Sequence, residues 1–426
     1  NPDRIADTAL LFLPWLSSSE SLLATMITFM ERAVYTQRTG ANLFEEVKTA
    51  IKRGVVLNNA SLVTTNFNVL WQHVAIVQPT DPACLDPPPG TAGCATDGIQ
   101  SDASFHQHGP ELLAGTYGEA YIIVVLHAVS LSQGTQFRLP VEQTELFASL
   151  LLDGIQWMMV GSPAVWDWSV RGRDMGSTAR RSTINASLLP DITTRSPELA
   201  NLACLLTGCG ATHSSSSPAT HPIGHRAYWT SDYSVIHSVS DGNYNNNNDN
   251  DNINGNGNGN AFSGVAWMAS VHMHSNRTVS ARCVNGEGAM NEHTGDGMVY
   301  TYVNGDEYDG AFDGWDWRRL PGITADVDSP MLVCNYSSQL FNDSTSTMNS
   351  TGTVSDGTSG MSSMRLRSHN VVALKSVAML PQGLVQLVTD VQCVSDDDDG
   401  GGGGGDVVGG GGVNDGGDVV VGVDVD

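Results

Sequence analysis

Residues 211–226, ATHSSSSPATHPIGHR, separate two parts of the chain whose sequence patterns differ. The stretch is rich in Ser, Thr and Pro, a composition typical of a linker between domains. Its histidines, His213, His221 and His225, are therefore expected to face solvent. Since a chain of 426 residues has room for two or three domains, we place a domain boundary here.

The part before this linker, residues 1–210, has the apolar spacing of amphipathic helices. Segments such as DTALLFLPWLSSSESLLATMITFMERAV and TELFASLLLDGIQWMMVG repeat apolar residues at helical intervals, with Ser, Asp and Thr available as caps. Several helices of this length, joined by loops, predict a helical array or toroid. No run of 18 uninterrupted apolar residues occurs, so a transmembrane helix is not expected.

The part after the linker, residues 227–394, alternates polar and apolar residues between turn signals. Examples are FSGVAWMASVHMHSN, GDGMVYTYVNGDEY and NVVALKSVAML, and they predict an antiparallel β domain. Residues 243–260, NYNNNNDNDNINGNGNGN, predict a disordered insertion in this domain. The Asp/Gly/Val stretch 395–426 predicts a disordered tail.

The charge of the chain limits the partners that it can have. The net charge is −25, and removing the nine Asp of the tail 395–426 leaves −16 on the rest. Because nucleic acids require basic surface, a nucleic-acid partner is not expected. A membrane partner is not expected either, and we expect a monomer. The chain opens at Asn1 without Met or a leader, as a mature or partial sequence does.

Cysteines and glycosylation sequons favour a secreted, extracellular protein. Cys84 with Cys94, and Cys204 with Cys209, are close enough in sequence to form local disulfides. Disulfides persist on the secretory route, where N-x-S/T sequons are glycosylated. The six sequons begin at Asn59, Asn185, Asn276, Asn335, Asn342 and Asn349.

Four stretches carry residues suited to chemistry. They are TNFNVLW (65–71), DASFHQHGPELLAGTYG (102–118), WDWSVRGRDMGSTARR (166–181) and HMHSNRTVSARCVNGEG (272–288). They supply Asn, His, Tyr and Arg without an evident pair of opposed acids, which is unsuited to most glycoside hydrolysis. The same side chains suit β-elimination beside a carboxylate. An amide and a guanidinium can stabilise the developing enolate-like charge, and a tyrosine can transfer the proton.

Several ordered blocks in these stretches carry a family resemblance. The blocks are Thr65–Asn68 with Trp71, Asp102–His108 with Tyr117-Gly118, Gly172-Arg173, Met273–Thr278, Asn285–Glu287, Asp296–Tyr300 and Asp316–Thr324. From the N-terminus to about residue 326 the chain resembles polysaccharide lyase family 8, which includes hyaluronate, chondroitin AC and xanthan lyases. The resemblance implies an (α/α) toroid followed by antiparallel β-sheets, with the active cleft between them.

The resemblance also implies roles for individual residues. Tyr117 would be the general base and acid, with His108 as its partner, Asn68 would neutralise a uronate carboxylate, and Arg173 would orient Tyr117. Asn66 is the competing alignment choice for Asn68. The implied substrate is a hyaluronan-, chondroitin- or xanthan-like acidic polysaccharide, and no cofactor is implied. Candidate substrate-binding residues are Trp71, Trp166, Trp168, Arg180, Arg277, Asn285 and Glu287.

The sequence departs from the family pattern at three positions. Ser177 stands where a second Arg is expected, Arg282 where a Glu is expected, and Gly288 where an Asn is expected. The β region is also shorter than that of the family. A homologue that binds carbohydrate without cleaving it therefore stays open as an alternative.

Two further interpretations of polar residues are weaker. Glu111 and Glu119 flank the His/Tyr block and leave a glycoside hydrolase as an alternative, although nothing opposes them as an acid pair. His272 and His274 share one face at strand spacing, but no Cys or carboxylate of clear ligand spacing accompanies them. No metal site is therefore expected.

Overall fold

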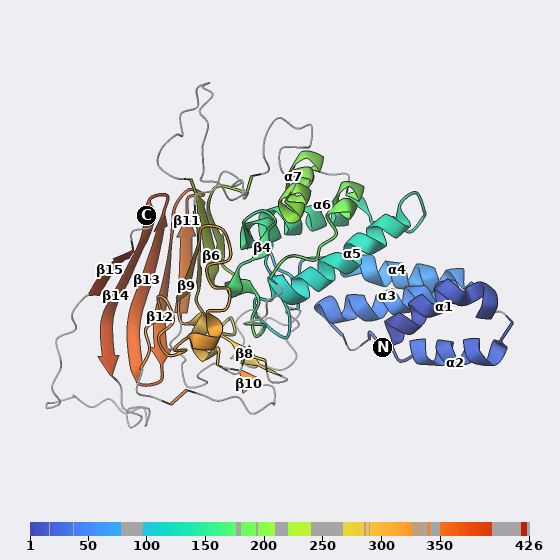
Figure 1. Ribbon diagram of the computed structural model, residues 1–426, viewed down its shortest axis with the longest axis horizontal. Helices are drawn as coiled ribbons and strands as arrows, with labels where there is room; N and C mark the ends of the chain where they lie inside the picture. The colour runs from blue at the N-terminus through green and yellow to red at the C-terminus, as the bar shows by residue number, and fades with distance from the viewer. Residues whose placement is uncertain are drawn as a thin grey trace, which may run out of the picture. The chain divides into compact units, whose positions relative to one another are not determined.

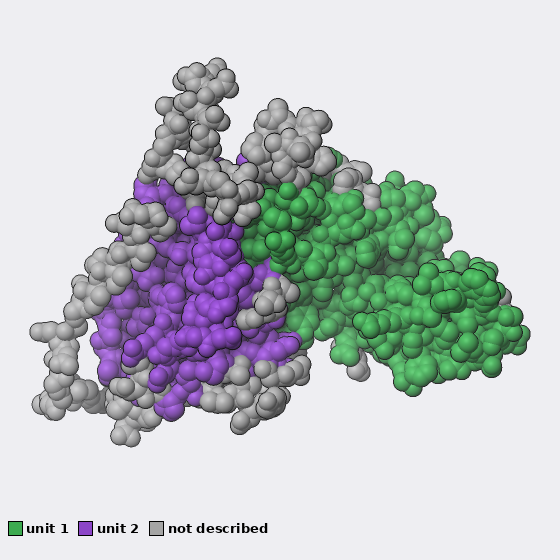
Figure 2. Space-filling view, viewed as in Figure 1, with its two compact units in different colours: residues 1–81, 93–166, 181–219 green, residues 82–92, 167–180, 220–426 purple. Residues whose placement is uncertain are grey.

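The computed structural model covers residues 1–426 and divides into two compact units. Unit 1 comprises residues 1–81, 93–166 and 181–219, and unit 2 comprises residues 82–92, 167–180 and 220–426 (Figure 2). The structure describes residues 1–16, 18–36, 38–77, 97–175, 180–192, 195–208, 220–239, 267–284, 287–288, 290–326, 330–331, 339–340, 350–393 and 419–423.

Unit 1 is helical (Figure 1). Its α-helices are α1 (Pro2–Leu16), α2 (Glu20–Met30), α3 (Gly40–Val56), α4 (Ala60–Gln72), α5 (Glu119–Ser132), α6 (Val141–Ser149) and α7 (Ser196–Thr207). Helix α1 packs against α2 and α3, and Ala6, Ala9, Leu16, Met30 and Val56 form an apolar cluster there. The apolar faces that the periodicity predicts are thus buried against neighbouring helices.

Short elements connect these helices. Two-stranded sheets pair β1 (Gly98–Ile99) with β2 (Phe105–His106), and β3 (Met159–Val160) with β4 (Val165–Trp166). Single helical turns of π or 3₁₀ type are η2 (Ala114–Gly118), η3 (Leu150–Gly154), η4 (Ile155–Met158) and η6 (Ala186–Asp191). Within the described residues, 114–132 is long and apolar enough to cross a membrane. Most of it is buried inside the protein, as in a core helix.

In its described residues, unit 2 contains two larger antiparallel sheets and one small strand pair. The four-stranded sheet has the order β5 (Gly224–Tyr228), β6 (Tyr233–Ser238), β7 (Trp267–His272) and β9 (Met298–Tyr302). The five-stranded sheet has the order β11 (Ser350–Ser355), β12 (Gly360–Ser368), β13 (Val371–Leu380), β14 (Gly383–Cys393) and β15 (Val419–Val423) (Figure 1). A small pair joins β8 (Arg282–Cys283) to β10 (Gln339–Leu340), and the 3₁₀ turns are η5 (Trp168–Val170), η7 (Glu292–Gly295) and η8 (Phe312–Gly314).

The two larger sheets share one apolar core. Ile236, Val271 and Val299 of the four-stranded sheet cluster with Val377 and Leu384 of the five-stranded sheet. Apolar side chains alternate along these strands toward the shared core, which is the arrangement of a β-sandwich. The predicted fold class, a helical domain followed by an antiparallel β-sandwich, is confirmed.

The linker ends earlier than the composition indicates. Strand β5 begins at Gly224, inside the range 211–226. His221 and His225 are buried, contrary to the prediction that they face solvent. The Nδ1 atom of His225 lies 2.8 Å from Ser355 Oγ, and burial lowers the pKa of His225 to about 4. Both histidines are thus part of unit 2, and His213 lies outside the described residues.

Two other segments differ from the sequence-based expectation. Residues 419–423, VVVGV, lie in the stretch predicted to be disordered, but they form β15 and pair with β14. Valine has a high β propensity, and the edge of β14 offers unpaired backbone groups. The segment 167–180 falls within the range assigned to the helical domain, and its contacts place it in unit 2. The Asn/Gly stretch 243–260 lies outside the described residues.

Candidate functional site

His108 and Tyr117 lie against each other in unit 1. Their ring centroids are 4.6 Å apart, with the planes nearly perpendicular, and both side chains are partly exposed. Tyr117 belongs to the π turn η2, a local widening of the helix that often occurs at functional sites. The predicted pair of an imidazole and a phenol therefore exists, and solvent reaches it.

The backbone around His108 is held in an uncommon conformation. His108 has φ +63°, in the left-handed region that few residues other than glycine adopt. On its two sides, the Nε2 atom of Gln107 donates to Asp97 Oδ2 at 2.6 Å, and the Gly109 N–H donates to Asp97 Oδ1 at 2.8 Å. One carboxylate thus fixes the chain on both sides of His108.

Asp97 and Gln107 also form hydrogen bonds with the start of helix α3. Gln107 Oε1 accepts from the Ala41 N–H at 2.8 Å, and Thr39 Oγ1 donates to Asp97 Oδ2 at 2.6 Å. Gly40 lies between them with φ +51°, and an added Cβ there would stand 2.2 Å from Gln107 Oε1. We name Thr39, Gly40, Ala41, Asp97 and Gln107 the α3 clamp. Sequence spacing could not reveal the α3 clamp, because its members are distant in sequence and carry no motif.

Helix α4 separates the two candidate asparagines. Asn59 caps the helix by accepting from the Leu62 N–H at 3.0 Å. Asn66 is buried and donates to the Leu62 carbonyl at 2.7 Å, whereas Asn68 is exposed. Two positions apart on a helix lie on different faces. Only Asn68 is therefore accessible to a ligand, which favours it over Asn66.

Trp71 and Trp166 are buried in unit 1. The Trp71 indole N–H donates to the Phe137 carbonyl at 2.7 Å, and its ring packs on Phe67. The Trp166 indole N–H donates to Glu119 at 3.2 Å. Both rings thus contribute to packing in this structure, and their predicted role in sugar stacking stays a prediction.

Glu111 and Glu119, the acids of the hydrolase alternative, are also buried. The Glu119 carboxylate accepts from Trp166, from Ser182 Oγ at 3.0 Å, and from both the N–H and the hydroxyl of Thr183. A carboxylate that accepts this many hydrogen bonds holds neighbouring segments together rather than serving as a free acid. The hydrolase alternative loses support.

The arginine-rich segment 167–180 is anchored in unit 2 by Asp167. This buried carboxylate accepts from Tyr302 Oη at 2.7 Å, from Tyr233 Oη at 2.8 Å, and from the Ser169 N–H at 3.1 Å. Trp168, which follows it, is buried, and its N–H donates to Tyr302 Oη. The segment is therefore fixed to strands β6 and β9.

Arg173 pairs with Glu287. The Arg173 Nε donates to Glu287 Oε2 at 2.8 Å, and the arginine is buried while the carboxylate is half exposed. Gly288 has φ +69°, and a Cβ there would come within 2.8 Å of Arg173 Cβ and 2.7 Å of the Arg282 carbonyl. The glycine at this family departure is thus required by close packing against Arg173. Ser177 and Asn285 lie outside the described residues.

The remaining candidate arginines are also paired. Arg180 is buried beside Asp309 at 3.2 Å, with its guanidinium 4.7 Å from the Trp168 ring centroid. Arg277 bonds the buried Asp232 at 3.0 Å and the Thr351 carbonyl at 3.2 Å. In this structure each guanidinium is engaged by a carboxylate of unit 2, and their predicted contacts with substrate stay predictions.

Two sets of histidines in unit 2 have different surroundings. His272 is buried, and burial lowers its pKa to about 4, while His274 Nδ1 lies 3.0 Å from the Gly295 carbonyl. A different group, Glu292, His293 and His369, places three nitrogen or oxygen atoms of metal-ligand type within 4.8 Å of one another. Because His369 is distant in sequence from the other two, no spacing could reveal this group.

One described cysteine of each unit takes part in a disulfide bond. Cys204 and Cys283 are disulfide-bonded, and Cys393 is an exposed free thiol. Cys84, Cys94 and Cys209 lie outside the described residues, so the predicted pairs stay predictions.

Two family models match the chain. The polysaccharide lyase family 8 N-terminal alpha-helical domain matches residues 20–189, and the polysaccharide lyase family 8 super-sandwich domain matches residues 261–399. The order of the two matches is the order of the helical and β parts described above.

The chain is also similar to individual proteins. It is 23% identical to chondroitinase-AC of Pedobacter heparinus over 366 residues, covering 84% of this chain and 44% of that protein. Among solved structures it is similar to a chondroitinase AC lyase, with TM-score 0.69 and 21% identity over 88% of this chain and 49% of the other. A chondroitin AC lyase of Streptomyces coelicolor A3 gives TM-score 0.67 and 18% identity over 92% and 53%.

A xanthan lyase of Paenibacillus gives TM-score 0.61 and 18% identity over 93% of this chain and 36% of that one. The chain thus spans about half the length of the relatives that it matches. At these identities the structural matches establish the fold.

Proposed function

Because this chain belongs to polysaccharide lyase family 8, we propose that it cleaves a uronate-containing acidic polysaccharide by β-elimination. The observation that carries the proposal is the edge-to-face pair of His108 and Tyr117, partly exposed and braced by the α3 clamp. The names of the relatives include chondroitin and xanthan lyases, and their substrates are acidic polysaccharides.

The proposed reaction begins with the proton at C5 of the uronate. Tyr117 removes this proton, and the electron pair of the C5–H bond forms a double bond between C4 and C5. The C4–O bond to the preceding sugar breaks, and its oxygen receives a proton from Tyr117, which ends as it began. General acid–base transfer of this kind contributes about 10² to 10⁴ in rate.

Asn68 and His108 would assist the proton transfer in different ways. The exposed amide of Asn68 can bind the uronate carboxylate and stabilise the charge that develops as C5 loses its proton. The imidazole edge beside the Tyr117 ring would orient the phenol toward that proton. The role that the resemblance implies for Arg173, orienting Tyr117, stays a prediction.

The test is a rise of ultraviolet absorbance from the conjugated product. Hyaluronan, chondroitin, chondroitin sulfate and xanthan would each be incubated with the wild-type chain, with Tyr117→Phe and with Tyr35→Phe. We name residues 102–118 the His108 loop. Tyr35 is a partly exposed tyrosine of unit 1 outside this loop, so its variant is a matched control. We expect absorbance on at least one polymer, lost by at least about 100-fold in Tyr117→Phe and retained in Tyr35→Phe.

Other outcomes would overturn the proposal in distinguishable ways. Product with unchanged rate in Tyr117→Phe would exclude this tyrosine as the base. New reducing ends without absorbance would indicate hydrolysis. Binding of a polymer by folded wild-type protein, with neither signal, would identify a carbohydrate-binding homologue that has lost catalysis.

We also propose that the protein acts outside the cell. The disulfide bonds at Cys204 and Cys283 support this, because disulfides persist in oxidising compartments. The proposal would be tested by detecting the native protein in the culture medium of its producing cells, with Cys204 and Cys283 resistant to alkylation until the protein is reduced. Retention in the cytosol with free thiols would contradict it.

A further inference from the structure

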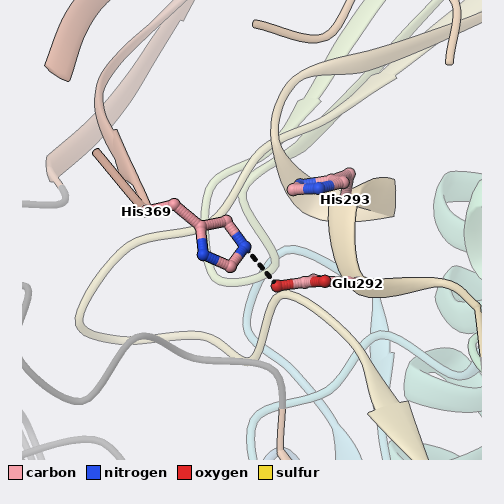
Figure 3. Close-up of side chains that lie close together, drawn as sticks. All are labelled: Glu292, His293 and His369. Atoms are coloured by element: carbon pink, nitrogen blue, oxygen red, sulfur yellow. Dashed lines mark hydrogen bonds and ion pairs between the residues drawn. The ribbon is translucent and has the colours of Figure 1, made fainter. Parts of the chain in front are cut away.

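Three metal-binding side chains of unit 2 gather at one place outside the proposed catalytic residues. Glu292 and His293 belong to η7, and His369 lies at the turn between β12 and β13 (Figure 3). One nitrogen of each histidine and one oxygen of Glu292 all lie within 4.8 Å of one another. Glu292 and His293 are buried, and His369 is partly exposed, so the group is open toward solvent on one side.

The ring of His293 is oriented by a buried carboxylate. Its Nδ1 lies 2.8 Å from Asp296 Oδ2, and Ser368 Oγ donates to the same oxygen at 3.1 Å. Histidines that bind metals usually engage a carboxylate or carbonyl through the second ring nitrogen, which fixes the tautomer and the ring. With Nδ1 engaged, Nε2 is the nitrogen of His293 left for a metal.

His369 is brought to the group by an unusual backbone conformation. It opens the two-residue turn that joins Ser368 to Val371, and it has φ +50°. This region is uncommon for residues other than glycine, and histidine, asparagine and aspartate are the residues that enter it most often after glycine. The His369 Nε2 lies 2.7 Å from Glu292 Oε1, as the dashed line in Figure 3 marks.

We propose that Glu292, His293 and His369 form a site for a divalent zinc-class metal ion. Two imidazole nitrogens and one carboxylate oxygen are a ligand set that Zn²⁺ accepts, with water in the fourth position. At metal–ligand distances of about 2.0 to 2.2 Å, tetrahedral ligand atoms stand about 3.3 Å apart. In this structure His369 Nε2 and Glu292 Oε1 lie 2.7 Å apart, and no two of the three ligand atoms are more than 4.8 Å apart, so the side chains would rotate to reach that geometry.

The bound ion would cross-link two parts of unit 2. One is η7, which begins at Glu292, a few residues after the Glu287 that pairs with Arg173, and the other is the β12–β13 turn. Its effect is therefore on the stability of unit 2, and it takes no step in the proposed elimination. The competing explanation is a plain hydrogen bond between Glu292 and His369, which needs no ion.

Calorimetric titration with Zn²⁺ would separate these explanations. The whole chain, stripped with a chelator, would carry Cys393→Ser, because the exposed thiol of Cys393 is itself a zinc ligand. We expect one Zn²⁺ per chain, and tetrahedral visible absorption bands when Co²⁺ replaces it. Thermal unfolding should shift upward with added Zn²⁺, because the ion binds only the folded state.

The decisive variant is His369→Asn. Asparagine tolerates the left-handed conformation, so the turn is kept while the imidazole is lost. We expect Zn²⁺ affinity to fall more than about 100-fold, since loss of even an outer hydrogen-bond partner costs about 10- to 100-fold. Glu292→Gln should also weaken binding, and His127→Asn, at an exposed histidine of α5, should leave it unchanged.

Two results would overturn the site. One is the lack of stoichiometric Zn²⁺ binding by folded wild-type chain, which would leave the hydrogen bond alone. The other is binding that His369→Asn does not change, which would assign the ion elsewhere, such as to the acidic stretch 396–399. Because the readout is metal binding, failure here leaves the elimination untouched.

Discussion

In the sequence, the His108 loop of unit 1 and the arginine-rich segment 167–180 of unit 2 both carry residues suited to catalysis. In the structure, the surroundings of these residues differ. In the loop, His108 and Tyr117 remain partly exposed while their neighbours are braced by the α3 clamp. In the segment, Arg171, Arg173 and Arg180 are buried and each is paired with a carboxylate.

This difference separates two uses of polar residues. In unit 1 the bracing falls on the residues around the candidate groups and leaves those groups open to a ligand. In unit 2 the arginines are themselves paired with carboxylates, so the positive charge that they bring to the segment is largely cancelled within the fold. Perturbing each region should therefore affect different properties.

The largest effect is expected at Lys375, which shows how far unit 2 buries charge. Its side chain is fully buried, its Nζ donates to the Asp296 carbonyl at 3.1 Å, and burial lowers its pKa to about 7. Lys375→Met should raise the free energy of unfolding at pH 6 by up to about 5 kcal/mol, from the energy equivalent of the pKa change.

The increase in the free energy of unfolding that Lys375→Met produces should depend on pH in a defined direction. An unfolded lysine stays protonated up to about pH 10.4, so between pH 7 and that value unfolding takes up a proton. Wild-type stability should therefore rise with pH through this window, and the advantage of Lys375→Met should shrink. Urea unfolding at several pH values measures both effects, with Lys52→Met as a surface control. A pH-independent difference would refute burial as the cause.

Asp167→Ala should produce the next largest effect, again on stability. The change leaves the hydroxyls of Tyr233 and Tyr302 without their carboxylate acceptor. Each buried group that loses its partner costs about 1 to 3 kcal/mol, so we expect a loss of about 2 to 5 kcal/mol. Urea unfolding measures it, and Asp167→Asn, which keeps one acceptor, should lose less. Equal losses would show that the carboxylate charge is the important property.

Asp97→Asn should instead affect activity through the position of His108. The amide cannot accept from Gln107, Thr39 and Gly109 together, so the loop loses part of its bracing. We expect kcat to fall about 10- to 100-fold with a small change in KM, as small misplacements of catalytic groups produce. Asp7→Asn, at a surface partner of Lys52, is the control. A larger effect on KM than on kcat would contradict a positioning role.

Asp309→Asn should have the smallest effect. Asp309 pairs with the buried Arg180, but its own side chain is 64% exposed. Pairs with an exposed partner contribute about 0 to 1 kcal/mol, and the ring of Trp168 still contacts the guanidinium. We expect a loss of less than about 1 kcal/mol in urea unfolding. A loss above 2 kcal/mol would mean that neutralisation in unit 2 depends on each single pair.

Repeating patterns made the fold class predictable. Helical periodicity in residues 7–34 and strand alternation in residues 370–380 correspond to α1, α2 and β13, because burial of one face requires that repeat. Composition was less reliable at the edges of elements. His221 and His225 are buried despite a linker-like sequence, and 419–423 is a strand despite its low-complexity surroundings.

The candidate site was predictable only where its residues are close in sequence. His108 and Tyr117 lie in one block, so their proximity followed from spacing. The α3 clamp and the pairing of Arg173 with Glu287 join residues more than 50 positions apart, and only the fold brings them together. Asn66 and Asn68 were distinguishable only once α4 had assigned each to a face.

The position of Gly40 affects how mutational scans of this chain are interpreted. It is the first residue of α3, where exchanging glycine for alanine ordinarily strengthens a helix. Here a methyl group would meet the Gln107 side chain in a backbone conformation that alanine avoids. Gly40→Ala, which helix propensity favours as a stabilising substitution, would therefore disturb the His108 loop, where His108 lies 68 residues away along the chain.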